Sequence, residues 1–381
     1  MKITKRLMVF VPVFLVFCCT LLTAGCSHTA KSEVNETITG ELDLLKNLDS
    51  ETAQKYISYK ELFPDAAAGS KLPDGIEDLF SLFFRDFNYK ILDTTVGNDK
   101  TSASASLRLT TIDARSVAED YAASLLEFKI LEVADHHSQN TNDTEISLEN
   151  YYLLLNSLLK DNKYKTAETN CTMELENTGD KDNPVWEIRR TYSLENDLVG
   201  GLMTYLSDPD ILSPENTLAV YMDTLKKMDL DEISSFLGVA SILNTSDPAK
   251  NSIATALVEQ VHSKFNYKIK DCTVDGYTAT VNTEITTFDS DTILADYQSQ
   301  LDEYLASPDA VINGSSGRYQ KSLELLLDSI EENTSITTTD VSFVLVNDGA
   351  SWKLENESTR LGDAIFGTLT TTPVNEENAA D

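Results

Sequence analysis

Two stretches of the chain alternate strictly between apolar and polar side chains. In the first stretch the apolar side chains, which share one face, are Ala103, Ala105, Leu107 and Leu109. In the second they are Ala279, Val281 and Ile285, with Thr280, Asn282 and Glu284 on the opposite face. A period of two residues is typical of a strand with one buried and one solvated face. Each stretch therefore predicts a strand in an antiparallel sheet that is covered on one side.

Helical periodicity surrounds both stretches. The predicted helices span residues 40–62, 73–86, 115–131, 147–161 and 198–206, and then 215–237, 248–264, 291–306, 317–332 and 361–369. Ser213-Pro214 supplies a cap and a first-turn proline for one of them. Further strands are predicted at 87–91, 265–269, 168–176, 185–193, 338–346 and 351–357, with Asn347-Asp348-Gly349 as a hairpin turn between the last two.

The order of elements repeats because the sequence itself repeats. Phe87-Asn88-Tyr89-Lys90-Ile91 recurs as Phe265-Asn266-Tyr267-Lys268-Ile269. Three more anchors match in the same order: residues 109–113 with 285–289, Asp120-Tyr121 with Asp296-Tyr297, and 186–188 with 352–354. Four collinear matches indicate two tandem homologous domains. The elements of each predict an α+β domain in which an antiparallel sheet of about four strands packs against helices.

The predicted boundaries follow from these matches. The first repeat covers residues 40–209 and the second 210–372, joined through Ser207–Pro214, which two prolines stiffen. Residues 26–39 are expected to form a polar spacer, and 373–381 a disordered acidic tail.

Charge narrows the range of partners. The 381 residues carry a formal net charge of −32, and no cluster of Lys and Arg with interleaved aromatic residues opposes that field. Such a surface repels phosphate backbones, so we expect no nucleic-acid partner. Of five cysteines, Cys171 and Cys272 lie within the repeats, and the sequence leaves open whether they are bridged or are buried thiols.

The first 25 residues read as a cleaved export signal. A basic start precedes an apolar stretch from Leu7 to Thr20, and the segment ends in Leu21-Leu22-Thr23-Ala24-Gly25-Cys26. It resembles a bacterial lipoprotein signal peptide. That resemblance implies cleavage before Cys26, a diacylglycerol on its thiol, and a position on the extracytoplasmic side of the cell membrane. The alternative, an uncleaved membrane helix, has about 18 apolar residues, the lower limit for a span, and leaves Cys26 unexplained.

The predicted architecture is similar to that of exported bacterial lipoproteins in the cystatin-like, nuclear-transport-factor-like superfamily. The similarity rests on the order of elements and on Trp186 and Trp352. It implies a curved sheet wrapped around helices to form a cone. Members of this superfamily include isomerases, dehydratases and non-catalytic binding domains, so the resemblance does not select a function.

Catalytic and metal-binding residues are hard to assign. Asp120-Tyr121 and Asp296-Tyr297 are the nearest acid and phenol pairs, but neighbours on a helix diverge by about 100°. We therefore expect each Tyr to pack and each Asp to cap a helix or face water. His28, His136, His137 and His262 have no partners at metal-ligand spacing, with His136-His137 expected in a polar loop. The acidic turns Asp180–Asn183 and Asp208–Asp210 do not match a calcium loop.

The sequence thus favours a lipid-anchored extracytoplasmic protein without cofactor or metal. Cys26 is its one assigned site, as the position of the lipid. The favoured role is non-catalytic binding of an envelope protein or small ligand, through the sheet concavities or an interdomain groove. One alternative is an enzyme or small-molecule carrier that uses the cavity of a cone-shaped domain. Another is a structural component of the cell envelope.

Overall fold

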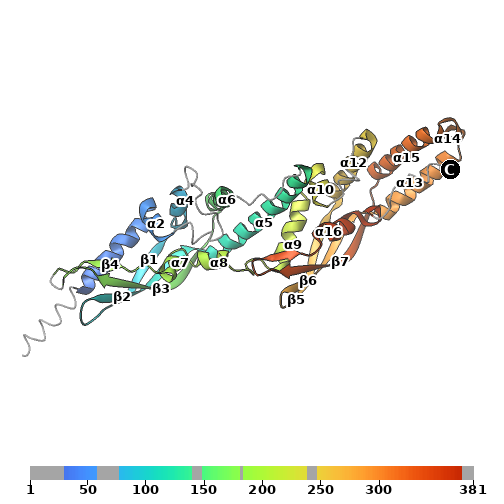
Figure 1. Cartoon of the computed structure of the whole chain (residues 1–381). Coiled ribbons are helices and arrows are strands. Elements are labelled where there is room, and N and C mark those ends of the chain that lie inside the picture. The colour runs from blue at the N-terminus through green and yellow to red at the C-terminus, as the bar shows by residue number, and fades with distance from the viewer. Residues whose placement is uncertain (1–29, 58–76, 140–147, 181–182, 238–246, 371–381) are drawn as a thin grey trace, which may run out of the picture. The chain divides into compact units, whose positions relative to one another are not determined.

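A computed structural model describes residues 30–57, 77–139, 148–180, 183–237 and 247–370. The chain divides into two compact units, Met1–Tyr121 with Ile146–Ser207, and Ala122–Glu145 with Asp208–Asp381. Each unit contains one four-stranded antiparallel sheet whose strands follow chain order. In each, helices lie over one face of the sheet (Figure 1). The predicted α+β class with two separate sheets is confirmed.

The elements of the first half begin with a helix over residues 30–46. The elements that follow are α2 (Ser50–Tyr56), α4 (Glu77–Phe83), β1 (Asn88–Val96), β2 (Ser102–Ile112), α5 (Ala114–Gln139), α6 (Leu148–Asp161), β3 (Thr166–Asn177), β4 (Trp186–Ile188), α7 (Tyr192–Leu198) and α8 (Leu202–Leu206).

The second half repeats this order. Its elements are α9 (Pro214–Leu225), α10 (Leu230–Phe236), α12 (Pro248–Lys264), β5 (Asn266–Asp275), β6 (Thr278–Phe288), α13 (Ser290–Leu305), α14 (Pro308–Ile312), α15 (Gly314–Glu331), β7 (Ile336–Asn347), β8 (Trp352–Leu354), α16 (Glu357–Phe366) and η1 (Gly367–Thr370).

The two units share details as well as order. The register of the first strand pair shifts once in each, between Ile91 and Asp93 and between Ile269 and Asp271. A lysine from the first helix bonds the asparagine that opens the strand in both: Lys46 Nζ donates to Asn88 Oδ1, and Lys226 Nζ to Asn266 Oδ1, each at 3.0 Å. These shared features are what a duplication predicts.

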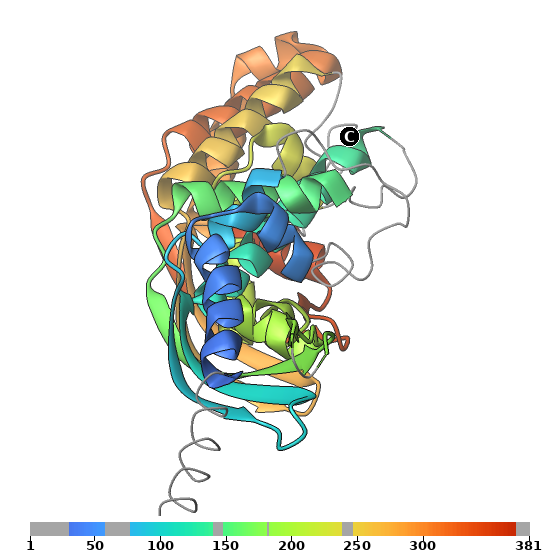
Figure 2. The same cartoon turned by 90° about the vertical axis from the view of Figure 1, so that its left-hand side faces the viewer.

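Residues 30–39 correct the expected polar spacer. They are helical, and Val34 and Ile38 are fully buried together with Leu42 and Leu45 of the same helix. The spacing of three or four residues places these side chains on one face of the helix. The helix, drawn in blue, lies alongside β1 (Figure 2), where Thr94 Oγ1 donates to Asn35 Oδ1 at 2.7 Å. The segment is part of the first core because its polar residues occupy only the outer face.

Two other predictions need correction near the ends of the units. The strands expected at 185–193 and 351–357 pair over only three residues each, in β4 and β8. The helix expected over 198–206 is shorter, because α7 ends at Leu198 and α8 spans only Leu202–Leu206, with Gly200 and Gly201 between them at φ values of +68° and +88°. A Cβ on Gly200 would lie 2.6 Å from Thr111 Oγ1, so glycine is needed at this break.

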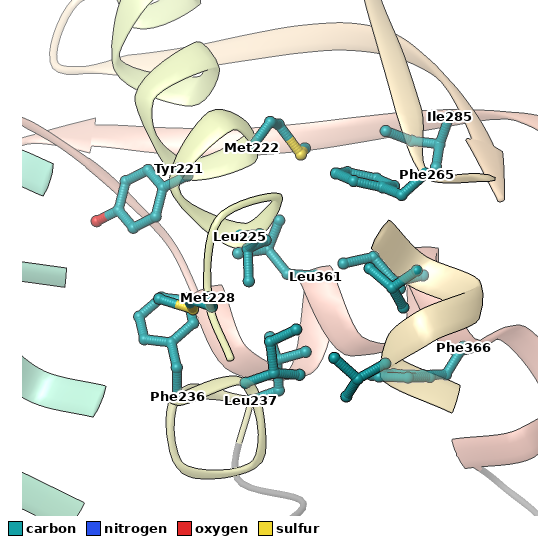
Figure 3. Packing of buried hydrophobic residues seen from close by; sticks show 14 of the residues in the cluster. Tyr221, Met222, Leu225, Met228, Phe236, Leu237, Phe265, Ile285, Leu361 and Phe366 are labelled. Carbon is teal, nitrogen blue, oxygen red and sulfur yellow. The ribbon is translucent and has the colours of Figure 1, made fainter. Parts of the chain in front are cut away.

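The core of the second unit fills the space between its sheet and its helices. Tyr221, Met222 and Leu225 of α9 pack in one buried cluster with Phe265, Ile285 and Phe366 (Figure 3). The inward strand positions Val281, Phe343 and Leu345 are fully buried in the same cluster. Ile130 and Ala134 of α5 also belong to it, because residues 122–145 are part of the second unit rather than the first.

Among the described residues, buried side chains cover the inner faces of both sheets, where the sequence suggested binding concavities. In the first unit the inward positions Ala105, Leu107 and Leu109 are fully buried, as Val281 and Ile285 are in the second. Among the described residues, none of the helices is both long and apolar enough to cross a membrane.

Candidate functional site

A polar, solvent-open pocket lies at the start of α5 in the first unit. It has a volume of about 420 Å³. Two segments form its walls: the first two turns of α5 with the residue before it, and the loop between α6 and β3. The lining residues are Asp113, Ser116, Asp120, Asn162, Lys163, Tyr164 and Lys165.

One wall is fixed by the start of α5. Asp113 accepts hydrogen bonds from the Ser116 amide at 3.3 Å and from Ser116 Oγ at 3.0 Å, the pattern of a helix cap. The amide of Asp113 in turn donates to the carbonyl of Lys165 at 2.8 Å, which ties this wall to the loop. Because its carboxylate is engaged in the cap, Asp113 serves mainly to hold the site together.

The opposite wall is held by Tyr164. Its hydroxyl donates to Asp120 Oδ2 at 2.9 Å and accepts from Asn162 Nδ2 at 3.2 Å. Partial burial, with a smaller contribution from the bond to Asp120, raises the pKa of Tyr164 to about 12. The phenol therefore stays protonated at neutral pH and acts as a hydrogen-bond donor, and it is not a base.

The raised pKa of Tyr164 predicts a specific alkaline titration. Because the folded pKa lies above the unfolded value of about 10, the stabilising contribution is fully present below that pH and is lost as pH rises through about 12. NMR of ring-labelled tyrosine should show Tyr164 ionising near pH 12, and Asp120→Asn should lower that value while burial keeps it above 10. A Tyr164 titration near pH 10 in the unmodified chain would contradict this geometry.

The two lysines complete the site. Lys163 and Lys165 are exposed at the rim, and within the described ranges neither ammonium forms an ion pair or a side-chain hydrogen bond. The pocket thus offers two ammonium groups, the carboxylate of Asp120, a phenol and an amide. Its lining contains neither His nor Cys, and the Ser116 hydroxyl is engaged by Asp113.

In the second unit the capped start of the corresponding helix, α13, is the same as in α5, but the loop that leads into the third strand differs. Asp289 caps α13 through the amide of Thr292 at 3.2 Å, and its own amide donates to the carbonyl of Ser335 at 3.1 Å, as Asp113 does to Lys165. The loop there reads Asn333-Thr334-Ser335 in place of Lys163-Tyr164-Lys165. Asn333 is buried against Gln260, with 3.3 Å between Asn333 Nδ2 and Gln260 Oε1. The cationic pocket is therefore a property of the first unit.

The acid and phenol pairs separate as expected from helical geometry. Tyr121 is buried and Asp120 is exposed, whereas Tyr297 is half-buried and Asp296 is exposed. Sequence reasoning did not foresee that Asp120 lines a pocket, because its partner Tyr164 lies 44 positions further along the chain. A comparison of the two repeats could have indicated the pocket. The aspartate that caps the helix is the same in both repeats, whereas the loop residues that complete the pocket differ.

The remaining candidates form no site in the described part of the chain. Cys26 and His28 lie outside the described residues, as do Lys181 and Asp182 of one acidic turn. His136 and His137 belong to α5 and not to a loop, so that expectation is corrected. His262 Nε2 bonds the carbonyl of Met228 at 2.8 Å. In the described ranges no three His, Cys, Asp or Glu side chains converge as a metal site would require.

The two cysteines and the other acidic turn have structural roles. Cys171 and Cys272 are both free thiols. Burial raises the pKa of Cys171 to about 12, so it is not a thiolate at neutral pH. Asp210 Oδ1 accepts from Trp352 Nε1 at 2.9 Å and from Asn347 Nδ2 at 3.0 Å. That carboxylate holds the β7–β8 hairpin in place.

Comparisons with known proteins add little. No family model and no curated protein matches the chain. A crystal structure of a Bacillus subtilis subsp. subtilis strain 168 protein, described as a candidate lipoprotein (ycdA), is 11% identical. The match covers 73% of this chain and 96% of that one, with a TM-score of 0.26. A likeness this weak carries no argument about fold or function.

Proposed function

We propose that this chain is a bacterial lipoprotein, held at the extracytoplasmic face of the membrane by acyl chains on Cys26, that binds a small polar ligand without transforming it. The anchor rests on the signal-like segment that ends at Cys26. The binding role rests on one observation, the pocket at the start of α5 with its two free ammonium groups.

The pocket favours a zwitterionic ligand such as a short peptide. Lys163 and Lys165 provide positive charge for a carboxylate, and Asp120 lies on the opposite wall for an ammonium group. The volume of about 420 Å³ is within the range of small-molecule sites. The protonated Tyr164 and the amide of Asn162 supply neutral hydrogen-bonding groups between the charges. This set of charged and neutral groups can position a ligand by both of its ends.

A titration with two matched peptides tests this proposal. Isothermal titration calorimetry on the full chain in detergent micelles should detect binding of dialanine. The N-acetyl amide of dialanine should bind more weakly, because that molecule lacks both charges. Replacing both pocket lysines, with Lys163→Gln and Lys165→Gln, should weaken dialanine binding about tenfold, since each exposed charge contact contributes about 0.2–1 kcal/mol.

Lys160→Gln is the matched control. Lys160 is an exposed lysine at the end of α6 that does not line the pocket, so its replacement should leave dialanine binding unchanged. Equal affinities for the charged and uncharged peptides, or unaltered binding in the double variant, would refute the zwitterion site. Turnover of the peptide during the titration would refute the non-catalytic role.

A further inference from the structure

The outer faces of the two sheets differ at one row of side chains. In the first unit this row, which we name the central row, consists of Lys90, Arg108 and Asn170 on β1, β2 and β3. The corresponding row of the second unit consists of Lys268, Glu284 and Asp340. Both rows lie on the solvated side, because the residues that flank Arg108 along β2, Leu107 and Leu109, are fully buried.

In the second unit the central row is electrically neutral once Lys270, which lies beside it, is counted. Lys268 lies directly opposite Glu284. Lys270, at the register shift of β5, bonds both acids of the row, with Nζ 3.0 Å from Glu284 Oε2 and 2.6 Å from Asp340 Oδ1. Every charge in this row therefore has an opposite charge beside it.

In the first unit the same row contains two cations and no acid. Lys90 lies directly opposite Arg108, so their Cβ atoms are about 5 Å apart. The shift position is Leu92 instead of a lysine, and Asn170 replaces the aspartate. Both cations are exposed, and in the part of the chain that the structure describes neither forms an ion pair or a hydrogen bond. Like charges directly opposite each other destabilise a strand pair.

The neighbouring row on the same face also differs between the units, because in the described part of the chain its side chains are hydrogen-bonded to one another only in the second unit. In the second unit, Asn282 Nδ2 donates to Asp271 Oδ1 at 2.7 Å, and Ser342 Oγ donates to Asn282 Oδ1 at 2.6 Å. The corresponding side chains of the first unit are exposed, and no hydrogen bond joins them in the described residues: Asp93, Ser106 and Thr172. Hydroxyl groups beside the cation pair are thus available to a ligand.

We propose that the outer face of the first sheet binds the single oxyanion of a hydroxylated molecule, such as a sugar acid or a sugar phosphate, at Lys90 and Arg108. The planar guanidinium of Arg108 matches the two oxygens of a carboxylate or phosphate, and Lys90 adds a second charge. Ser106 and Thr172 bond the hydroxyl groups of the ligand body. This site is distinct from the pocket of the proposed function.

The surrounding acids limit the ligand to one anionic group. Asp93 lies in the row on one side of the cation pair, and Glu168 lies in the row on the other side. Glu174 is one row further along β3. Together with the net charge of −32, these carboxylates repel a polyanion or an anionic membrane, whereas a compact ligand with one carboxylate or phosphate group contacts only the two cations.

Equilibrium dialysis of the full chain in detergent, with radiolabelled glucose 6-phosphate and glucuronate, tests the site. One or both should bind, and unlabelled glucose should not compete. Arg108→Glu, which copies Glu284 of the second unit, should weaken binding at least tenfold. It should also raise the thermal midpoint by about 1–3 °C, because it pairs Lys90 with an acid. A loss of binding with a gain in stability excludes unfolding as the cause.

Lys90→Gln and Lys268→Gln form the matched pair, since they change equivalent lysines of the two units. The first should weaken binding and the second should not. Equal competition by glucose, tighter binding of polyphosphate, or retention of binding in Arg108→Glu would overturn the proposal. Loss of sugar-anion binding through Lys163→Gln and Lys165→Gln instead would assign the anion to the α5 pocket, which would overturn this site while leaving the proposed function intact.

Discussion

Cys26→Ala is expected to move the protein out of the membrane fraction of a bacterial host, or to leave it as an uncleaved precursor. A single acyl chain binds a membrane only marginally, and two chains together anchor stably, since each buried CH₂ contributes about 0.8 kcal/mol. Loss of the thiol removes the attachment point for diacylglycerol, so nearly all of the anchoring should disappear. Fractionation, with the intact mass of the protein, measures the effect.

Ser27→Ala is the control for this prediction. Ser27 follows the proposed lipid attachment site and has no thiol to carry the lipid, so its replacement should leave both the fractionation and the lipid-dependent mass of the protein unaltered. A Cys26→Ala protein that keeps the mass and the membrane association of the unmodified protein would refute lipidation. It would also favour the membrane-helix interpretation of residues 1–25.

Phe343→Ala is expected to cost about 3–5 kcal/mol in the free energy of unfolding of the second unit. Phe343 is fully buried on β7 opposite Val281, within the cluster formed by α9, α12 and α16. Removing the ring leaves a cavity, because the surrounding side chains are too tightly packed to move into the space. Since a domain is stable by only about 5–15 kcal/mol, this is a large fraction of the total.

The two tryptophans allow this loss to be assigned to one unit. Trp186 belongs to the first unit and Trp352 to the second. In a Trp186→Phe background, the fluorescence of Trp352 should report a urea midpoint lowered by about 1–3 M. In a Trp352→Phe background, the Trp186 transition should stay in place. Ser342→Ala, at an exposed neighbour of Phe343, removes only an exposed hydrogen bond to Asn282 and should shift either midpoint far less than Phe343→Ala shifts that of the second unit. Equal shifts of both transitions would contradict separate cores.

The helices and strands with the strongest periodicity were predictable from the chain alone. Helix α12 has the bounds that its apolar spacing predicts, because Asp247 caps its start and the Phe265 strand follows its end. The cap at Ser213 is confirmed by its bond from the amide of Asn216 at 3.2 Å. Such elements are predictable because local propensity, capping and burial all favour the same structure.

The errors arose where tertiary packing outweighed local composition. Residues 30–39 read as polar because polar and charged side chains together outnumber apolar ones, yet Val34 and Ile38 at helical spacing are enough to bury one face. The pocket at α5 could not be derived from either segment alone, since Tyr164 and Asp120 meet only through the fold. The anchor residue Cys26 stays a prediction.

Because α5 contributes residues to both units, the second unit cannot be expressed alone simply by cutting the chain at the joint. A fragment that begins at the proline-containing joint near residue 208 contains every strand of the second sheet but lacks Ile130 and Ala134, which complete its core. Such a fragment would expose apolar core residues to solvent and would aggregate on expression. Recombinant production of that half calls for grafting residues 122–139 back onto it.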